Sequence, residues 1–339
     1  MFLCYIVIKL LNTEVTMLNK KWLIVGGTGS FGQEITNQIF EKYDPKKVYI
    51  YSRDEYKQHL MNNKFKKDPS ELQFFVGDVR DLERLKMATD GVDYIIHTAA
   101  LKHVPSCEYN PFEAIKTNVL GSQNVIQAAL YNNVKKVIAL STDKAVNPMN
   151  LYGATKLCME KLIIGGNAYV GDKNIKFSIC RYGNVIGSRG SVVQTFKKQK
   201  RVGTISITNP EMTRFWISLK NAAEFVLNSL AIMQGGEIFV PKMPSMKITD
   251  LAECIAPDAL IKVIGVRPGE KIHEMLIAKD DRILMEAENF YIIENNYHWN
   301  NKGPYDYDCE EIENFDYTSD TNDKWLTVEE MRGLLNDIL

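Results

Sequence analysis

Short apolar runs alternate with helix-length segments in the first half of this 339-residue chain, and no other feature limits its possible folds as much. Segments long enough for helices lie between the runs, notably Pro111 to Tyr131 and Tyr152 to Ala168. This alternation predicts an α/β fold with a doubly wound parallel sheet and helices on both faces. The runs that have the length and composition of buried strands are 22–25, 48–51, 72–76, 94–96, 137–140 and 177–180.

The rhythm of the chain changes after residue 182. Glycine and serine become frequent between Gly183 and Ser191, and the following elements are shorter. We therefore predict a sheet domain over residues 20–182 and a smaller C-terminal lobe over residues 183–339, partly interleaved with the first, that covers a substrate. The pattern Thr327-Val-Glu-Glu330 is a capping box, which predicts a helix that runs to the C-terminus.

Residues 1–17 precede the first predicted strand. Their apolar stretch is interrupted by Lys9 and is too short to span a bilayer. We interpret them as an N-terminal extension without structure of its own; a weak contact with a membrane or another subunit is the alternative. No later stretch approaches the roughly twenty apolar residues of a membrane span, so we expect no stable membrane insertion.

Charge, cysteines and histidines exclude several classes of function. The net charge of −1 argues against a dedicated nucleic-acid surface. The 6 cysteines contain no C-x-x-C pair, which is typical of a protein from the reduced cytoplasm rather than a disulfide-stabilised one. The 5 histidines form no metal-binding pattern, so we expect no metal.

A glycine-rich loop directly follows the first predicted strand and opens a helix. Glycines permit a tight turn and the close approach of a ligand, and the helix N-terminus then faces a pyrophosphate. A glycine turn that serves only packing is the alternative. The position between strand and helix favours a dinucleotide site, with contacts from Gly26, Thr28, Gly29, Ser30, Phe31 and Gly32.

The end of the second strand decides which dinucleotide is bound. An NAD-binding protein usually has an acidic residue there that accepts hydrogen bonds from the ribose 2′-hydroxyl. This chain has Ser52 and Arg53, with Lys57 one turn later, and they favour the 2′-phosphate of NADP. Asp54 stands one position late and keeps NAD open, and Arg53 and Lys57 are alternatively a solvated helix start.

Tyr152 and Lys156 lie four residues apart in a predicted helix. Residues at this spacing share one helix face, so Lys156 is placed to lower the pKa of the phenol and to hold a nicotinamide ribose. A tyrosinate so placed takes a proton from an alcohol while a hydride leaves its carbon. The pair follows the strand that ends at Leu140, and this position favours a catalytic pair over surface residues at helical spacing.

These segments resemble the extended short-chain dehydrogenase/reductase superfamily, and within it the soluble inverting UDP-N-acetylglucosamine 4,6-dehydratases. The resemblance runs from about Lys20 to the C-terminus and implies a Rossmann-like fold. The matching segments besides the glycine loop are 52–55, 99–105, 140–145, 150–156, 181–184, 212–216 and 267–271.

The dipeptide Asp143-Lys144 distinguishes among relatives in this superfamily. Sugar 4-epimerases typically carry no acid/base pair there, and retaining glucose-type dehydratases have Asp-Glu. Inverting dehydratases resemble this chain, although the larger membrane-bound ones tend to have methionine where Tyr152 stands. The resemblance therefore points to the soluble inverting branch.

The resemblance implies a role for each of these residues. Tyr152 acts as base at O4, Lys144 as base at C5, and Asp143 as acid at O6. A lysine base must be partly neutral near neutral pH, so its pKa has to fall through burial or a neighbouring cation such as Lys102 or Lys156. An ion pair that caps a strand is the alternative interpretation of Asp143 and Lys144.

Further cofactor contacts are expected after the third and fourth strands. Asp78 and Val79 are placed to reach the adenine, although Asp78 is alternatively a turn residue that caps the next helix. The resemblance implies that Ala99 and Lys102 lie near the cofactor, with Lys102 near the sugar as well; an ordinary loop cation is the alternative for Lys102. Thr117 is expected to contact the cofactor or to serve only helix packing.

The substrate implied by the resemblance is UDP-N-acetylglucosamine. Arginine matches phosphate geometry in two-point contacts, so two arginines are natural diphosphate ligands, although each is alternatively a surface ion-pair partner. A glutamate suits the uridine ribose. The residues expected to bind the substrate are Lys102, Asn184, Ser191, Val192, Arg214, Arg267 and Glu270.

Other functions stay open on the sequence alone. A UDP-sugar 4-epimerase or a retaining 4,6-dehydratase of the same superfamily would use the same cofactor loop. A non-enzymatic NADP-sensing scaffold would retain the fold without turnover. The resemblance further implies a cytoplasmic homo-oligomer that makes modified amino sugars for polysaccharide biosynthesis.

Overall fold

The computed structural model describes most of the chain, including all the motifs identified above. The predicted N-terminal extension lies outside the described residues except for Met17, which is fully buried. The described residues are 17–188, 190–281, 284–294, 307 and 309–336.

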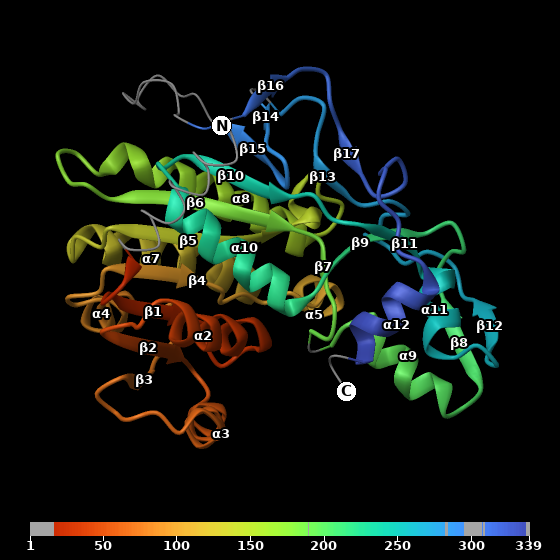
Figure 1. Cartoon of the computed structure of the whole chain (residues 1–339), viewed down its shortest axis with the longest axis horizontal. Coiled ribbons are helices and arrows are strands. Elements are labelled where there is room, and N and C mark those ends of the chain that lie inside the picture. Colours follow the sequence, from red (N-terminus) through yellow and green to blue (C-terminus); the bar gives the residue numbers. More distant parts are fainter. Residues whose placement is uncertain (1–16, 189, 282–283, 295–306, 308, 337–339) are drawn as a thin grey trace.

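A large central sheet forms the body of the molecule, and ten strands of the described chain join it (Figure 1). Their order across the sheet is β16-β14-β15-β10-β6-β5-β4-β1-β2-β3. The strands from β3 to β10 run parallel, whereas β15, β14 and β16 are antiparallel. The seven parallel strands are β1 Lys21–Val25, β2 Lys47–Ser52, β3 Leu72–Val76, β4 Tyr94–His97, β5 Lys136–Thr142, β6 Lys176–Tyr182 and β10 Glu237–Pro241. The last three are β14 Leu284–Glu286, β15 Phe290–Glu294 and β16 Glu310–Ile312.

The six predicted strands are all confirmed as β1 to β6, and so is the doubly wound sheet. β1 pairs with β2 on one side and with β4 on the other, so the order of the strands reverses between β1 and β4. The connections on the two sides of this point cover opposite faces of the sheet. A crevice therefore opens at the carboxyl ends of β1 and β4, which is where α/β sheets bind ligands.

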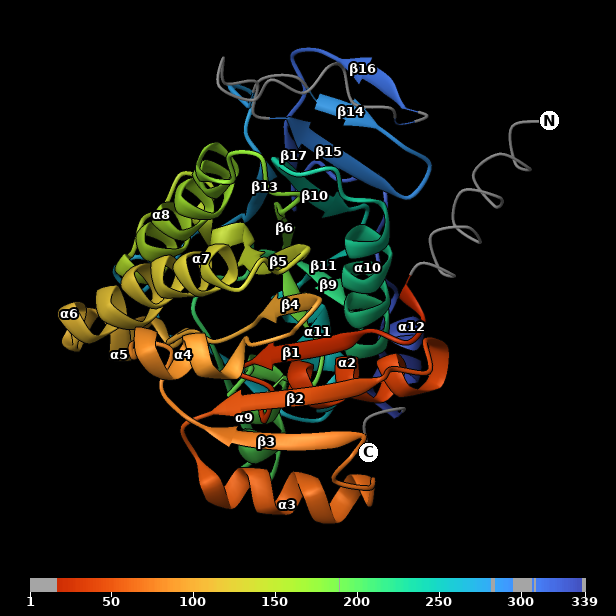
Figure 2. The same ribbon diagram turned by 90° about the vertical axis from the view of Figure 1, so that its left-hand side faces the viewer.

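Helices cover both faces of the sheet (Figure 2). Helices α2 (Ser30–Lys42) and α10 (Leu219–Ile232) pack against each other on one face, where Gln38 donates a hydrogen bond to the Lys220 carbonyl at 2.9 Å. Helices α4 (Leu82–Ala88), α7 (Gly121–Tyr131) and α8 (Leu151–Gly165) lie on the other. The other helices of this part include α3 Glu55–Phe65, α5 Val104–Tyr109, α6 Pro111–Ile115 and the short 3-10 helices η2 Asp143–Ala145 and η3 Gly166–Tyr169.

The predicted helix from Pro111 to Tyr131 is confirmed, and it contains a feature that the sequence did not indicate. One π-helical turn, η1 (Lys116–Leu120), lies between α6 and α7. Such turns insert an extra residue into a helix and are frequent at functional sites. Here the turn carries Thr117 and Asn118, which are both buried.

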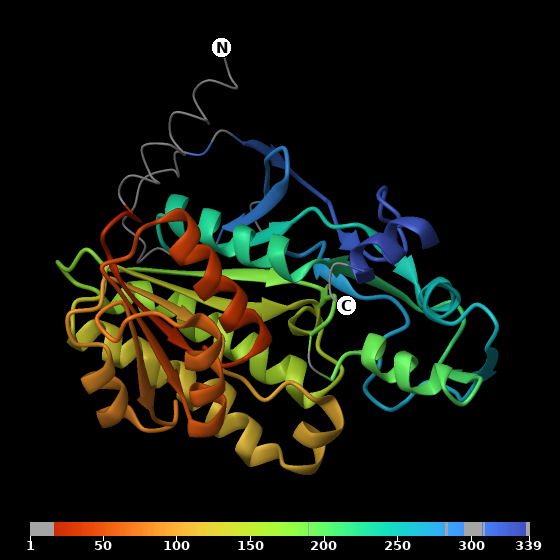
Figure 3. The same ribbon diagram turned by 60° about the horizontal axis from the view of Figure 1, so that its bottom comes forward.

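A second group of short elements lies beyond the carboxyl edge of the sheet (Figure 3). It has its own cluster of buried apolar side chains, with Phe196, Trp216 and Met331 among them. The strands are β7 Asn184–Val185, β8 Thr204–Ile207, β9 Thr213–Ile217, β11 Ser245–Lys247, β12 Leu260–Val263, β13 Met275–Ile277 and β17 Tyr317–Thr318. The helices are α9 Val192–Lys200, α11 Ile248–Ile255 and α12 Val328–Asn336.

The chain leaves the central sheet after β6 and returns to it with β10, which pairs in parallel with β6. The boundary after residue 182 stays a prediction. The predicted capping box is confirmed, because the Thr327 hydroxyl accepts a hydrogen bond from the Glu330 amide at 3.2 Å and the Glu330 carboxylate accepts one from the Thr327 amide at 2.8 Å. Across the part of the chain that the structure describes, we find no helix with the length and apolar character of a membrane span.

Candidate active site

A cavity of about 1020 Å³ lies at the carboxyl ends of the strands, between the sheet and the second group of elements. This volume is at the upper end of the range for small-molecule sites, as expected where two ligands bind together. All predicted site residues line the cavity except Asp78 and Asp143. Those that do are Gly26, Thr28, Gly29, Ser30, Phe31, Gly32, Ser52, Arg53, Asp54, Lys57, Val79, Ala99, Lys102, Thr117, Lys144, Tyr152, Lys156, Asn184, Ser191, Val192, Arg214, Arg267 and Glu270.

The glycine-rich loop has the geometry of a dinucleotide cradle. Gly26 has a φ of +85°, and a Cβ there would lie 2.7 Å from the Thr98 hydroxyl. At Gly32 a Cβ would overlap the carbonyl of Gly27, so α2 begins closer to the loop than any side chain allows. Gly29 caps α2 without a side chain, which leaves the first-turn amides of this helix open toward the cavity.

Three buried hydroxyls on the cavity wall have no hydrogen-bond partner among the described residues. They belong to Thr117 on η1, Ser141 at the end of β5, and Ser191 at the start of α9. Buried polar atoms are nearly always paired in folded proteins, so groups of this kind mark positions where a ligand supplies the partner. A nicotinamide dinucleotide, which carries hydroxyls and phosphates along its length, fits both these hydroxyls and the loop.

The end of β2 presents two cations at the cavity rim. The side chains of Arg53 and Lys57 are each about half exposed. Asp54 instead caps α3, accepting a hydrogen bond from the Lys57 amide at 2.9 Å, and its carboxylate lies 2.7 Å from the Lys57 ammonium. These hydrogen bonds with Lys57 lower the pKa of Asp54. Asp54 is therefore already occupied by helix and ion-pair contacts.

Asp78 lies outside the cavity wall. Its carboxylate accepts hydrogen bonds from the Arg80 guanidinium at 2.6 and 3.0 Å, and one oxygen also accepts from the Arg80 amide at 3.0 Å. The Arg80 guanidinium also forms an ion pair with the Glu113 carboxylate, at 2.6 Å. These contacts are those of a turn aspartate, while its neighbour Val79 does line the cavity.

Tyr152 lies in the first turn of α8, and the start of this helix is firmly held. The Asn150 side chain accepts a hydrogen bond from the Gly153 amide at 2.9 Å, and Glu108 on α5 accepts one from the Leu151 amide at 2.7 Å. Burial raises the pKa of Tyr152 to about 12, against the nearby Lys144 ammonium and a hydrogen bond with Thr142. The phenol is thus protonated in the ligand-free site.

Lys156 does not have the influence on Tyr152 that its spacing suggested. Its ammonium donates hydrogen bonds to the Leu140 carbonyl at 2.5 Å and to the Met159 sulfur at 3.1 Å. Burial lowers its pKa to about 8, although Glu160 opposes the shift. The cation that lowers the pKa of the phenol is instead Lys144.

Lys144 lies between two carboxylates. Its ammonium is 2.9 Å from Asp143 and 3.1 Å from Glu274, which are both almost completely buried. Burial acts to lower the pKa of Lys144, but the two carboxylates outweigh it, so the pKa is raised. The expectation that this pKa falls is therefore wrong for the ligand-free site, because sequence reasoning did not include Glu274.

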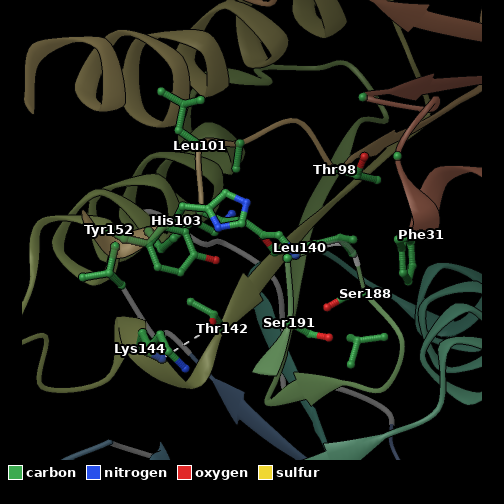
Figure 4. Close-up of a pocket in the computed structure, with 18 of the residues that line it drawn as sticks. Phe31, Thr98, Leu101, His103, Leu140, Thr142, Lys144, Tyr152, Ser188 and Ser191 are labelled. Atoms are coloured by element: carbon green, nitrogen blue, oxygen red, sulfur yellow. Dashed lines mark hydrogen bonds between the residues drawn. The ribbon is translucent and has the colours of Figure 1, made fainter. Parts of the chain in front are cut away.

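Burial also acts on Asp143, whose carboxyl group contacts the Lys144 ammonium. It is fully buried, and its pKa is raised by burial and by Glu274, against the opposing effect of Lys144. The Thr142 hydroxyl donates a hydrogen bond to one carboxylate oxygen at 2.9 Å, while the other oxygen is buried and has no hydrogen-bond partner among the residues that the structure describes. Figure 4 shows Tyr152, Thr142 and Lys144 together at one end of the cavity, with Phe31 and Thr98 from the cofactor side at the other.

The predicted substrate residues lie along the same cavity, but some of their side chains are held by hydrogen bonds and others are exposed. Arg214 on β9 is buried, and its guanidinium donates to the carbonyls of Thr213, Lys271 and Ile272 at 2.6 to 2.9 Å. Arg267 is exposed at the rim. Lys102 lines the same cavity as Lys144. Its pKa is lowered mainly by partial burial and to a smaller extent by the positive charge of Lys144.

Glu274 is the residue of this site that sequence reasoning missed. It stands three residues after the conspicuous segment that ends at Lys271, and a single glutamate there carries no signal of its own. Only the fold brings it to Lys144. Among the residues that the structure describes, no group of His, Cys, Asp and Glu side chains has the arrangement of a metal site.

Comparisons with known proteins identify relatives of this chain along nearly its whole length. The chain is 50% identical to a protein of Campylobacter jejuni strain 81-176 named UDP-N-acetylglucosamine 4,6-dehydratase (inverting), over 94% of this chain and 97% of that one. It is 41% identical to a UDP-glucose 4-epimerase of Rickettsia bellii, over 94% and 96%. The solved structure of Pen from Bacillus thuringiensis superposes with a TM-score of 0.86 at 36% identity, covering 95% of this chain and 99% of that one.

A family model described as polysaccharide biosynthesis protein matches residues 22–295, which include the glycine loop, the Tyr152 and Lys156 pair and the Asp143-Lys144 dipeptide. The chain therefore belongs to the polysaccharide biosynthesis protein family of extended short-chain dehydrogenase/reductases.

Proposed function

We propose that this protein is a hydro-lyase that converts UDP-N-acetylglucosamine into a UDP-4-keto-6-deoxy-hexosamine with inversion at C5. One observation carries the proposal. A phenol and a lysine ammonium, from Tyr152 and Lys144, line the end of a cavity that fits a dinucleotide, and the buried Asp143 carboxyl lies 2.9 Å behind the ammonium. The name of the Campylobacter relative supports the same reaction and substrate.

The first step is oxidation of the sugar at C4. When bound, the nicotinamide dinucleotide accepts a hydride from C4 and later returns it to C6. Tyr152 takes the O4 proton, for which the phenol must first be deprotonated. Lys144 favours the tyrosinate, because a nearby positive charge stabilises the anion.

The new ketone acidifies the proton on C5, which allows elimination of water. Lys144, as the free amine, removes that proton while Asp143 gives its proton to O6, and the C6–O6 bond breaks. A double bond forms between C5 and C6. Hydride addition at C6, which the bound dinucleotide would supply, leaves an enolate at C5. C5 then takes a proton from water on the face opposite to Lys144, which inverts that centre. The protons held by Tyr152 and Lys144 neutralise the resulting hydroxide and return Asp143 to its acid form.

We propose NADP as the cofactor. Arg53 stands half exposed at the cavity rim, 3.7 Å from Asp78, and Lys57 beside it pairs with Asp54 at 2.7 Å. Guanidinium binds phosphate well in two-point contacts, so a 2′-phosphate can take Arg53 as its partner. Asp54, the candidate for a ribose carboxylate, is committed to the cap of α3. Ser52, next to Arg53 in the chain, also lines the cavity.

A second candidate is a 4-epimerase, which the name of the Rickettsia relative favours. An epimerase oxidises C4 and returns hydride to the other face of C4, so it needs no acid or base at C5 and C6. The buried Asp143 and Lys144 pair has no task in that reaction.

Proton NMR in deuterated buffer, with UDP-N-acetylglucosamine and catalytic NADP, tests the proposal. We expect a 4-keto-6-deoxy product with deuterium at C5, the inverted configuration there and no net consumption of cofactor. UDP-N-acetylgalactosamine that retains its C5 proton would instead identify an epimerase. Unchanged substrate with tightly bound NADP would identify the sensing scaffold.

We also propose a cytoplasmic homo-oligomer. Large apolar side chains are exposed on adjoining helices, with Tyr109 on α5 88% exposed and Phe112 on α6 60% exposed. Surfaces of this kind are frequently covered by another subunit. Light scattering of the eluting protein should give a mass that is a multiple of 38.7 kDa; a single chain mass would refute the oligomer.

A further inference from the structure

Glu274 is a buried carboxylate that lines the cavity and contacts Lys144. Its side chain is only 2% exposed, and its backbone amide donates a hydrogen bond to the Ser319 hydroxyl at 2.9 Å. One carboxylate oxygen contacts the Lys144 ammonium, and the other is buried without a hydrogen-bond partner among the described residues.

The proposed reaction sets a condition on the protons of this cluster. Elimination needs Asp143 with a proton and Lys144 without one. Burial raises the pKa of Asp143, whereas the 3.1 Å contact pairs the Lys144 ammonium with the Glu274 carboxylate. Moving one proton from Lys144 to Glu274 gives the required state without adding or removing a proton from the cluster.

We propose that Glu274 is a positioning residue that accepts the ammonium proton of Lys144 and so releases the free amine for its attack on C5. This inference rests on the proposed dehydratase function. In the step, one N–H bond of Lys144 breaks and one O–H bond forms on Glu274, across a contact of 3.1 Å. The ammonium and carboxylate become a neutral amine and a neutral acid.

The charges around Glu274 explain how substrate binding would favour this transfer. The Arg214 Nε lies 3.7 Å from its carboxylate, and Lys271 also lowers its pKa. The remaining titratable neighbours are Asp143, across Lys144, and His273, whose Nδ1 contacts the Thr213 hydroxyl at 2.9 Å. Arg214 and Lys271 line the cavity, so a bound diphosphate offsets their charge and raises the proton affinity of Glu274.

The test is Glu274→Gln, which keeps the shape of the side chain but removes its ability to take a proton. Two rates are measured with UDP-N-acetylglucosamine and NADP in deuterated buffer: single-turnover C4 oxidation, by NADPH absorbance, and C5 exchange, by NMR. We expect oxidation to persist and exchange to fall at least about 100-fold, as for a lost proton-transfer group. Glu274→Asp, which retains a carboxylate, should recover at least about tenfold of that loss.

Glu286→Gln is the matched control, because it removes the carboxylate of another lysine pair, 2.5 Å from Lys242 and outside the cavity wall. We expect its two rates to equal those of the wild type. NADP binding and thermal unfolding establish that each variant is folded. If Glu274→Gln does not fold, Glu274→Asp carries the test alone, with reduced exchange, preserved oxidation and a shifted pH profile expected.

Opposite results distinguish the possible failures. If Glu274 only raises the pKa of Lys144, and the ammonium proton goes to solvent instead, Glu274→Gln will exchange C5 as fast as the wild type or faster, with its pH profile displaced to lower pH. That outcome overturns the proposal, as does equal loss in both Glu274 variants. A wild-type enzyme that oxidises C4 without exchanging C5 would refute the dehydratase function itself.

Discussion

The buried ion pair between Arg181 and Glu160 offers a quantitative test of how the catalytic helix is held. Arg181, at the end of β6, is 4% exposed, and Glu160, on α8, is 1% exposed. The guanidinium donates to the two carboxylate oxygens at 3.0 and 2.8 Å, and to the Leu276 carbonyl of β13 at 2.8 Å. The pair thus joins α8 to the sheet and to the strand that follows Glu274.

Arg181→Met removes the cation and leaves the Glu160 charge buried with no equal partner. Breaking a buried pair in this way costs about 3–5 kcal/mol of unfolding free energy, because the remaining charge keeps its desolvation penalty. For a chain of this size that corresponds to a fall in Tm of roughly 10 °C. In the double variant Glu160→Met/Arg181→Met both fully buried charges are removed, and only the part-exposed Asp281 carboxylate, 3.5 Å from Arg181, loses a partner. We therefore expect most of the loss to be recovered.

Urea unfolding followed by circular dichroism measures Arg181→Met, Glu160→Met and the double variant against the wild type. The double-variant cycle isolates the energy of the pair from the loss of packing. A single variant that loses less than about 1 kcal/mol would refute the reasoning. A double variant as unstable as the sum of the two single variants would refute it as well.

Three further predictions concern the cofactor domain. Gly32→Ala should weaken NADP binding at least tenfold in a fluorescence titration, because the new Cβ overlaps the Gly27 carbonyl. Gly333→Ala should not, because its Cβ would meet nothing within 4 Å in the described part of the chain beyond its own helix. Burial lowers the pKa of His97 to about 3, so its contribution to stability is complete above the unfolded pKa near 6.5 and is lost as pH falls. Between these values the unfolding free energy should drop by up to about 1.4 kcal/mol per pH unit, and a His97→Gln variant should show a flatter profile. Arg53→Ala should reduce NADP affinity roughly tenfold and leave NAD affinity unchanged by calorimetry, a loss typical of one charged contact; equal effects on both would contradict NADP selectivity.

The sheet could be predicted because its strands are buried on both faces and therefore appear as continuous apolar runs. All six runs became strands, and the residues between them became helices. The extension of the sheet by β14, β15 and β16 could not be predicted in the same way, because β14 and β16 have three residues each. The π turn at 116–120 has no distinguishing residues either.

The site residues also differ in how far they could be predicted, according to whether they form a local pattern or meet only in the fold. The glycine loop and the spacing of Tyr152 and Lys156 are local patterns that can be recognised in the sequence. In the structure both line the same cavity. The charge state of Lys144 depends on Glu274, which comes from a distant segment and reaches it only through the fold. The predicted direction of the Lys144 pKa was wrong for this reason. Lys156 likewise bonds a backbone carbonyl that no spacing rule reveals.

The central claim is that the amine of Lys144 removes the C5 proton after C4 is oxidised. The most direct measurement compares C5 deuterium incorporation by wild type and Lys144→Ala, each mixed with NADP and UDP-N-acetylglucosamine in deuterated buffer. Our account predicts that the variant still transfers hydride from C4 but incorporates no deuterium at C5. Incorporation at the wild-type rate by Lys144→Ala would contradict it.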